Sequence, residues 1–353
     1  MSGSETLVPA AMALDAGGAA RDRKAEHIEL ALEQRMQLER TFFDDWRFEH
    51  VALPEIDRAE VDTGTAFLGR HLAAPLLIAC MTGGTELASA INRNLAAGAV
   101  ATRVAVGVGS QRKALEGESG EETFLVRQAA PSVPLLANLG AVQLNYGFGV
   151  DQCARAVEMI GADALVLHLN PLQEAIQPEG QTRFADLLPR IAEVARALPV
   201  PVIAKEVGSG ISEAVALRLA GAGIEIVDTA GLGGTSWARI EAARAGDAPL
   251  GEVFADWGLP TPESIRQCRR VPGLTVIGSG GVRNGVDVAK AIALGADLVG
   301  LAFPFLAAAT ESAERVAERV RRIVTELEIT MFCLGVRTLA ELREVPIHER
   351  SPR

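Results

Sequence analysis

A short apolar run, a polar or glycine-rich turn and an amphipathic segment repeat along most of the chain. The apolar runs lie at residues 74–81, 105–110, 134–140, 164–170, 201–207, 224–231, 274–281 and 298–303. Runs this apolar are typical of parallel strands that helices cover on both faces. The segments between them, such as EAVALRLAGAG and GVDVAKAIALGA, have the spacing of amphipathic helices. Eight such units in succession predict an α/β fold, a (β/α)8 TIM barrel, with a doubly wound sheet as the alternative.

The chain before the first apolar run divides at about residue 22. Residues 1–22 lack the basic start of a signal peptide, and Pro9 and Asp15 interrupt their apolar run, so we expect a mobile tail. The stretch DRKAEHIELALEQ predicts a helix on which Arg23, Lys24 and His27 can address one ligand. A solvated basic helix end is the alternative for these cations. We expect residues 23–353 to form a single barrel domain with this helix as an N-terminal clamp.

Composition limits the expected partners and compartment. Lys and Arg total 34 against 45 Asp and Glu, a formal charge of −11, which argues against nucleic acid or an anionic membrane as a partner. The four cysteines form no CxxC pair, and no apolar stretch approaches the roughly 20 residues of a membrane-spanning helix. We therefore expect a cytoplasmic protein, in which an anion site must gather its positive groups locally.

Polar residues stand at the carboxyl ends of nearly all the predicted strands, where a barrel has its active site. Gly278-Ser279-Gly280-Gly281, between the seventh strand and a helix, is typical of a phosphate site, because glycine lets backbone N–H groups approach oxygen atoms. A glycine-rich turn without function is the alternative. With Thr82, Asn138 and Lys205 at other strand ends, this loop suggests flavin mononucleotide (FMN), whose reduced ring a lysine can stabilise. The alternative for Lys205 is a Schiff-base lysine.

The stretch HLNPLQE after the fourth strand places a histidine, two amides and a carboxylate close together. We interpret it as part of a polar substrate pocket; a hydrogen-bonded core residue is the alternative for His168. Glu174 alone could not hold a dehydrated divalent ion, but it suits Mg²⁺, which keeps waters and uses substrate phosphate oxygens as ligands. Arg112, after the second strand, adds another cation.

Nine stretches of the chain, in order, resemble the type 2 isopentenyl diphosphate isomerases, the flavin-dependent class. They are RKAEHI, MTGGT, GVGSQR, ANLGA, LHLNPLQE, KEVGSGIS, DTAGLGGTSW, FADWGLPT and GSGGVRNGVDVAKAIALGADLVGLA. The most specific are HLNPLQE, KEVGSGIS and GGTSW, since many flavin and nucleotide barrels share the GSGG loop. The resemblance implies conversion of isopentenyl to dimethylallyl diphosphate in isoprenoid biosynthesis. It also implies bound FMN that is reduced before catalysis, by NADPH or by a partner reductase, a requirement for Mg²⁺, and a homotetramer or homo-octamer.

The resemblance also implies a role for individual residues. FMN would contact Thr82, Gly83, Ser110, Asn138, Lys205, Thr235, Gly280, Gly281 and Ala302. The substrate would contact Arg23, Lys24, Arg112 and His168 through its diphosphate, and Asn170 and Gln173 near its hydrocarbon end. Glu174 would hold Mg²⁺. The stretch LAFP, which contains Ala302, departs from the family pattern, where a basic residue is more usual.

The isomerisation adds a proton at C4 of an alkene and removes one at C2, with a tertiary cation at C3 as the intermediate. None of the side chains named above is an obvious acid of the strength that this step needs. We therefore expect reduced FMN to act as acid and base, with Lys205 keeping it anionic. We place Lys205, His168 and Gln173 as the catalytic side chains, with His168 donating to the diphosphate.

Other classes of protein fit the sequence less well. An FMN-dependent α-hydroxy-acid oxidase needs a His–Arg pair after the sixth strand, where GLGGTSWARIEAAR contains no histidine. An enzyme similar to inosine monophosphate dehydrogenase needs a nucleophilic cysteine there, and the nearest, Cys268, lies in a segment with a helical pattern. A non-enzymatic phosphate or flavin sensor would not need polar residues at so many strand ends.

Overall fold

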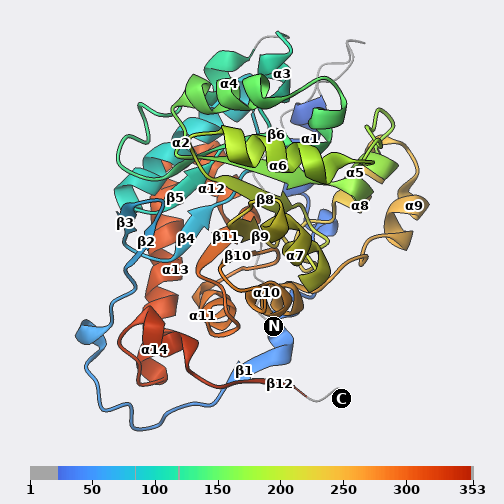
Figure 1. Ribbon diagram of the computed structural model, residues 1–353. Coiled ribbons are helices and arrows are strands. Elements are labelled where there is room, and N and C mark those ends of the chain that lie inside the picture. The colour runs from blue at the N-terminus through green and yellow to red at the C-terminus, as the bar shows by residue number, and fades with distance from the viewer. Residues whose placement is uncertain (1–22, 84, 118–119, 351–353) are drawn as a thin grey trace, which may run out of the picture.

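Eight parallel strands close into a barrel at the centre of the molecule (Figure 1). The computed structural model describes residues 23–83, 85–117 and 120–350, so the tail predicted at residues 1–22 lies outside the described residues. The barrel strands are β4 (Leu76–Ile78), β5 (Ala105–Gly107), β6 (Leu135–Gly140), β7 (Ala164–Leu169), β8 (Val202–Glu206), β9 (Ile226–Asp228), β10 (Thr275–Ser279) and β11 (Leu298–Leu301). Each lies inside one of the predicted apolar runs, and β11 pairs with β4 to close the ring. The barrel is confirmed, and the doubly wound alternative is wrong.

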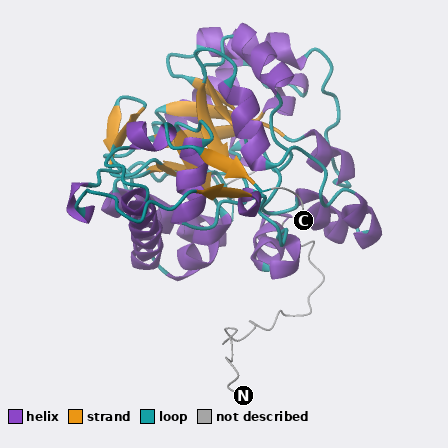
Figure 2. Cartoon of the chain, turned by 90° about the horizontal axis from the view of Figure 1, so that it is seen from below, coloured by secondary structure: helices purple, strands orange, loops and turns teal. Residues whose placement is uncertain are grey.

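Helices cover the outside of the barrel (Figure 2). They are α1 (Arg23–Leu32), α2 (Glu86–Thr102), α3 (Arg112–Leu115), α4 (Val150–Ile160), α5 (Pro171–Ile176), α6 (Leu187–Ala197), α7 (Glu213–Gly221), α8 (Trp237–Arg244), α9 (Ala248–Val253), α10 (Thr261–Arg269), α11 (Gly285–Ala293), α12 (Phe303–Glu311), α13 (Ala313–Cys333) and α14 (Leu339–Arg343). Capping side chains set several starts: Thr85 begins α2, Ser212 begins α7 and Asn284 begins α11.

Alternation along the strands separates two hydrophobic layers. One face of each strand points into the barrel, where residues such as Leu77, Leu136, Ile203 and Ile277 form the inner core. The opposite face packs against the helices and forms the larger outer core. Lys205 lies two residues beyond Ile203 on β8, so it shares the inward face.

Two small antiparallel sheets complete the structure, and the strand pattern did not predict them. The strands β2 (Thr65–Phe67) and β3 (Arg70–Leu72) form a hairpin whose Phe67 and Leu72 join the inner core of the barrel. The strand β1 (Trp46–Phe48) pairs with β12 (Ile347–Glu349), which holds the C-terminal end of the described chain beside the segment that precedes the barrel. Runs of three residues are too short to give a hydrophobic period of their own.

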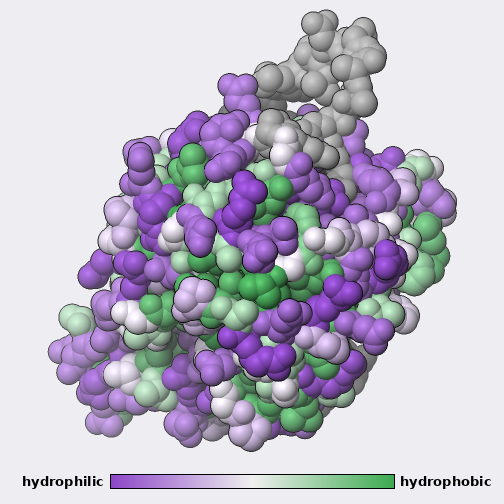
Figure 3. Space-filling view, turned by 45° about the horizontal axis from the view of Figure 1, so that its top comes forward, coloured by the Kyte–Doolittle hydropathy of each residue, from purple (hydrophilic) through white to green (hydrophobic). Residues whose placement is uncertain are grey.

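The surface of the protein is mixed in character. Hydrophilic side chains cover most of the face in Figure 3, with hydrophobic ones gathered toward its middle. Among the described residues, no helix combines the length and apolar character needed to span a membrane.

One close helix contact should tolerate no side chain at all. A Cβ on Gly285, the first residue of α11, would lie 2.3 Å from the backbone of both Ile323 and Leu327 in α13. We expect Gly285→Ala to lower the free energy of unfolding by about 2–3 kcal/mol, because backbone atoms cannot yield as side chains do. Gly221→Ala is the matched control, since a Cβ there meets nothing within 4 Å. Urea denaturation of both variants measures the difference, and equal stabilities would contradict the prediction.

Candidate functional site

A cavity of about 250 Å³ opens at the carboxyl ends of the barrel strands, and the segments after all eight strands line it. Every predicted site residue whose side chain is described lies in its wall. These residues are Lys24, Thr82, Gly83, Ser110, Arg112, Asn138, His168, Asn170, Gln173, Glu174, Lys205, Thr235, Gly280, Gly281 and Ala302. The backbone of Arg23 begins α1, but its side chain lies outside the described residues. The barrel therefore brings together residues that are spread over most of the sequence.

The loops after β9 and β10 pack backbone against backbone at one side of the cavity. Gly280 and Gly281 have φ angles of 105° and 71°, which favour glycine. A Cβ on Gly280 would lie 2.1 Å from the carbonyl oxygen of Gly231, and one on Gly281 would lie 2.3 Å from that of Gly233. Neither loop could approach the other if these residues had side chains. The result is a wall of bare backbone, the surface that an anionic oxygen-rich group can approach closely.

Arg283 extends this wall and was not among the residues predicted from the sequence. Its guanidinium lies 5.0 Å from the ring centroid of Phe303 and donates a 3.2 Å hydrogen bond to Gln37 Oε1. Burial lowers the pKa of Arg283, with Asp287 opposing that shift. Arg283 stands two positions beyond the glycines in GSGGVRNG, past the strand end where site residues were expected.

Lys205 lies at the end of β8 with its ammonium group in the wall of the cavity, and it is 8% exposed. Its Nζ donates to the carbonyl oxygen of Glu206 at 2.8 Å and lies 3.6 Å from Asp228 Oδ2. The carboxylate of Glu206 turns away and accepts hydrogen bonds from the amides of Val207, Gly208 and Ser209. A buried positive charge with this orientation can stabilise negative charge on a ligand in the cavity.

Cys80 lies beside this charge, in the cavity wall. Burial raises its pKa to about 12, although Lys205 works in the opposite direction. Burial likewise raises the pKa of Cys268, in α10, to about 12. Both thiols are therefore protonated near neutral pH and are poor nucleophiles.

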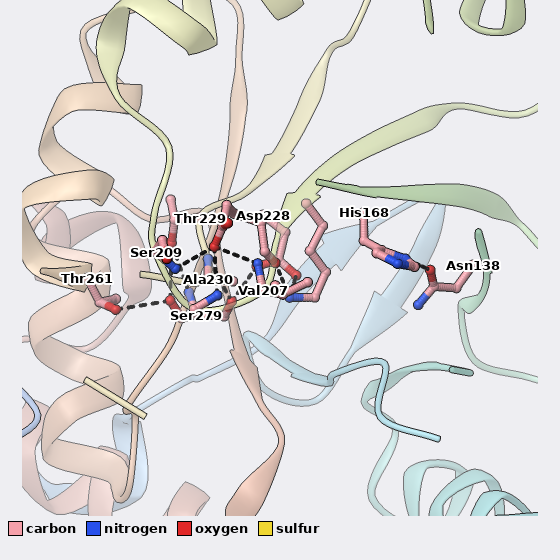
Figure 4. A network of polar contacts seen from close by, with 12 residues as sticks. Asn138, His168, Val207, Ser209, Asp228, Thr229, Ala230, Thr261 and Ser279 are labelled. Atoms are coloured by element: carbon pink, nitrogen blue, oxygen red, sulfur yellow. Dashed lines mark hydrogen bonds and ion pairs between the residues drawn. The ribbon is translucent and has the colours of Figure 1, made fainter. Parts of the chain in front are cut away.

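Asn138 determines how His168 presents its ring. The amide nitrogen of Asn138 donates to the carbonyl oxygen of Val108 at 3.2 Å, so its Oδ1 faces His168 Nδ1 at 2.8 Å (Figure 4). Nδ1 must carry a hydrogen to satisfy that oxygen. Gln111 holds Asn138 in place, because its Oε1 accepts a hydrogen bond from the backbone N–H of Asn138 at 3.0 Å. The Asn138 side chain is thus occupied by protein groups, and His168 is held at the cavity wall by its Nδ1.

The stretch after β7 forms the short helix α5 with its polar side chains on one side of the cavity. Glu174 is buried, and its carboxylate accepts hydrogen bonds from Asn170 Nδ2 at 2.9 Å and from the Gln181 amide at 2.6 Å. Asn170 Oδ1 is buried without a protein partner among the described residues. The described chain contains no group of three or more His, Cys, Asp or Glu that could hold a metal ion. A metal ion at Glu174 would therefore draw its other ligands from neutral oxygen atoms, either of protein amides such as Asn170 Oδ1 or of molecules bound in the cavity.

The helix α1 forms one wall of the cavity. Lys24 Nζ donates to the Ser110 carbonyl at 3.1 Å and lies 5.2 Å from the centroid of the Phe124 ring. His27 packs edge-on against Trp237, with ring centroids 5.2 Å apart. The structure thus places Lys24 of this helix in the cavity wall, and its role in binding a ligand stays a prediction.

Glu241 in α8 joins α1 to α5, and it too was not among the residues predicted from the sequence. Its fully buried carboxylate lies 3.0 Å from His27 Nε2, 2.7 Å from Gln173 Nε2 and 2.6 Å from the Arg244 guanidinium. Burial acts to raise the pKa of Glu241, but His27, Gln173 and Arg244 outweigh it, so that the pKa is lowered. The only hint in the sequence was its place in the helix that follows GGTSW.

Comparison with known proteins gives a consistent family. A model of the FMN-dependent dehydrogenase family matches residues 175–349. The isopentenyl-diphosphate delta-isomerase of Nostoc sp. is 50% identical over 329 residues, which cover 92% of this chain and 94% of that protein. The isopentenyl-diphosphate delta-isomerase of Synechococcus sp. is 53% identical over 327 residues, with coverage of 91% and 94%.

Solved structures of lower identity share the fold. A mandelate oxidase variant with an FMN adduct superposes with a TM-score of 0.63 at 19% identity, covering 95% of this chain and 94% of that chain. A flavocytochrome b2 variant with pyruvate bound gives a TM-score of 0.65 at 21% identity, covering 93% and 82%. Identities this low support a common barrel and carry no information about the reaction.

The Glu241 network should make stability depend on acidity. The pKa of Glu241 is lower in the folded protein than its ordinary value, so its ionised form stabilises the fold at neutral pH. That contribution is complete above the ordinary pKa of a glutamate, about 4.3, and is lost as the pH falls below it through the lower pKa of the folded state. We expect Glu241→Gln to cost about 2–3 kcal/mol at pH 7, and to cost progressively less as the pH falls below about 4.

Chemical denaturation at a series of pH values measures this difference. Glu252→Gln is the control, because that carboxylate is 62% exposed in its pair with Arg239 and should contribute little at any pH. A difference between wild type and Glu241→Gln that stays constant with pH would contradict the assignment.

Proposed function

The chain belongs to the family of isopentenyl-diphosphate delta-isomerases, and we propose that it interconverts isopentenyl and dimethylallyl diphosphate with FMN bound in the barrel cavity. The observation that carries the proposal is that one cavity contains both a bare glycine backbone and the inward-pointing ammonium group of Lys205. The first suits a phosphate and the second suits an electron-rich ring.

The residues of the cavity fit FMN. The phosphate would lie against Gly280 and Gly281, beside Arg283 and the start of α12 at Ala302. The ring system would lie among strand-end residues at the other side of the cavity, near Thr82, Gly83, Ser110, Asn138, Lys205 and Thr235. When bound and reduced, FMN supplies an electron-rich ring with a nitrogen that can give and take back a proton.

The chain's own side chains would bind the diphosphate. Lys24, Arg112 and His168 place positive or hydrogen-bond-donating groups in the cavity wall, and Arg23 begins the same helix as Lys24. A diphosphate carries several negative charges, so it requires such a local cluster in a protein whose net charge is −11. Gln173 and Asn170 would lie at the hydrocarbon end, where Glu241 holds the Gln173 amide in place.

The apolar part of the cavity would protect the reaction from water. Ile28 and Ala31 of α1 line the cavity together with Met81, Trp237 and Leu306. A tertiary carbocation reacts readily with water, so a wall without hydroxyl groups is needed around C3. The N-terminal helix would therefore serve both ends of the substrate, with Lys24 at the diphosphate and Ile28 at the hydrocarbon.

Two further parts of the proposal concern what the protein works with. NADPH would be the reductant of the flavin, and the assembly would be a homotetramer or homo-octamer in the cytoplasm. Mg²⁺ would bind between Glu174 and the substrate diphosphate, since Glu174 offers a carboxylate there and Mg²⁺ accepts phosphate oxygens as ligands.

The proposal is tested with purified protein, FMN, dithionite and isopentenyl diphosphate. We expect a yellow protein whose spectrum bleaches on reduction and which forms dimethylallyl diphosphate only in the reduced state, as followed by proton NMR. Lys205→Ala should retain FMN but lose about 10²–10³ in turnover, because the charge aimed into the cavity is gone. Lys113→Ala, a lysine in α3 that does not line the cavity, is the control. A colourless wild-type protein, or full turnover of reduced Lys205→Ala, would overturn the assignment.

The role of Glu174 is tested by the dependence on Mg²⁺. We expect Glu174→Gln to keep normal FMN content, to lose most of its activity, and to need at least about tenfold more Mg²⁺ for half-saturation, because a hard cation prefers a charged oxygen ligand. If Glu174 were instead a base, the Mg²⁺ midpoint would stay constant and only the maximum rate would fall. A titration of activity with Mg²⁺ at saturating substrate separates these two outcomes.

A further inference from the structure

We infer that Asp228 is a positioning residue, which holds the Lys205 ammonium at the cavity wall and ties it to the glycine loop after β10. The inference rests on the FMN site proposed above. It adds a residue that lies behind that site and can act on a ligand only through its neighbours.

The pairing of three adjacent strands puts Asp228 between the two groups. Asp228 ends β9, and it pairs with Lys205 of β8 on one side and with Ile277 of β10 on the other. Ser279 lies two residues beyond Ile277, on the same strand face. Lys205 and Ser279 line the cavity, whereas Asp228 does not and is only 2% exposed. Figure 4 shows Asp228 beside Thr229, Ala230 and Ser279 in one polar network.

The hydrogen bonds of Ser279 connect Asp228 to the loop after β10. The Ala230 amide donates to Ser279 Oγ at 3.1 Å, and the Ser279 hydroxyl donates to Asp228 Oδ1. The single hydroxyl hydrogen is therefore committed to the carboxylate. The Ser279 carbonyl accepts from the Gly231 amide at 2.8 Å, and Gly280 follows directly. Asp228 is thus hydrogen-bonded to Ser279, and the bonds of Ser279 to Ala230 and Gly231 join the starts of the two glycine loops.

The charges around Lys205 leave Asp228 as its counter-charge. Among the described residues, Asp228 is the carboxylate that pairs with Lys205 Nζ, at 3.6 Å. The neighbouring Glu206 directs its carboxylate to backbone amides, and the nearby Cys80 thiol is neutral. A buried ammonium group without a counter-charge is disfavoured, and it would lose its charge or turn out of the wall. Either change would remove positive charge from the cavity.

The test compares the affinity of the protein for reduced and oxidised FMN. Dissociation constants in both states are measured for wild type, Asp228→Asn, Lys205→Met and the double variant. We expect Asp228→Asn to reduce the preference for reduced FMN about tenfold, and to have no further effect when Lys205 is already methionine. Asp163→Asn is the control, because Asp163 pairs with Arg127 and Arg70 at the start of β7, outside the cavity wall. It should leave the preference unchanged.

The sign of the change separates this role from others. If Asp228 acted by its own negative charge, its removal would favour the anionic reduced flavin, and the preference would rise. A rise, an unchanged preference, or an equal fall with and without Lys205 would each overturn the inference. If Asp228→Asn does not fold, Ser279→Ala keeps both charges and breaks the link, and a smaller fall is expected. Wild-type protein that does not bind FMN would instead refute the proposed function.

Discussion

Closure of the strand ring is the constraint on which the rest of the molecule depends. Because β11 pairs with β4, every barrel strand has two neighbours, and the inward side chains have only the space inside the ring. At the lower levels that space is filled by residues such as Leu136, Ile203 and Ile277. At the carboxyl ends of the strands, the same alternation points polar side chains into the ring. On the inner face of β8, for example, Ile203 is followed two residues later by Lys205. The site is therefore the top layer of the core, built with charged residues in place of hydrophobic ones.

Burial of those charges would be costly if each stood alone. Lys205 has Asp228, and Glu241 has His27, Gln173 and Arg244. Arg244 lies in the same helix as Glu241, but Asp228, His27 and Gln173 each come from another strand or helix than the charge they meet, so these contacts also join the segments around the mouth of the barrel. A net charge of −11 is compatible with a cationic cavity, because the cations of the site are gathered at the carboxyl ends of the strands.

The sequence predicted the features that local patterns encode. Each of the eight apolar runs contains a barrel strand, and the inward direction of Lys205 follows from its distance to Ile203. Glu241 and Arg283 were not predicted. Their surroundings arise from long-range packing of α8 and of the loop after β10, and no local sequence pattern encodes such packing. The β2–β3 hairpin was missed because its strands are too short to show alternation. The roles assigned to individual residues stay predictions, and for Arg23 the position of the side chain is not described either.

The attachment of α1 has a consequence for how the protein is made. The helix is ten residues long, too short to be stable in water by itself, and its Glu26 is bonded to Arg244, 218 residues later in the chain. At about 5–20 residues per second, a ribosome needs about 10–40 s to synthesise that partner after the helix has appeared. A helix that is made before the barrel is thus among the last segments to find its place. The cavity wall that α1 forms is added only when most of the barrel already exists, so a nascent chain cannot carry a complete cavity.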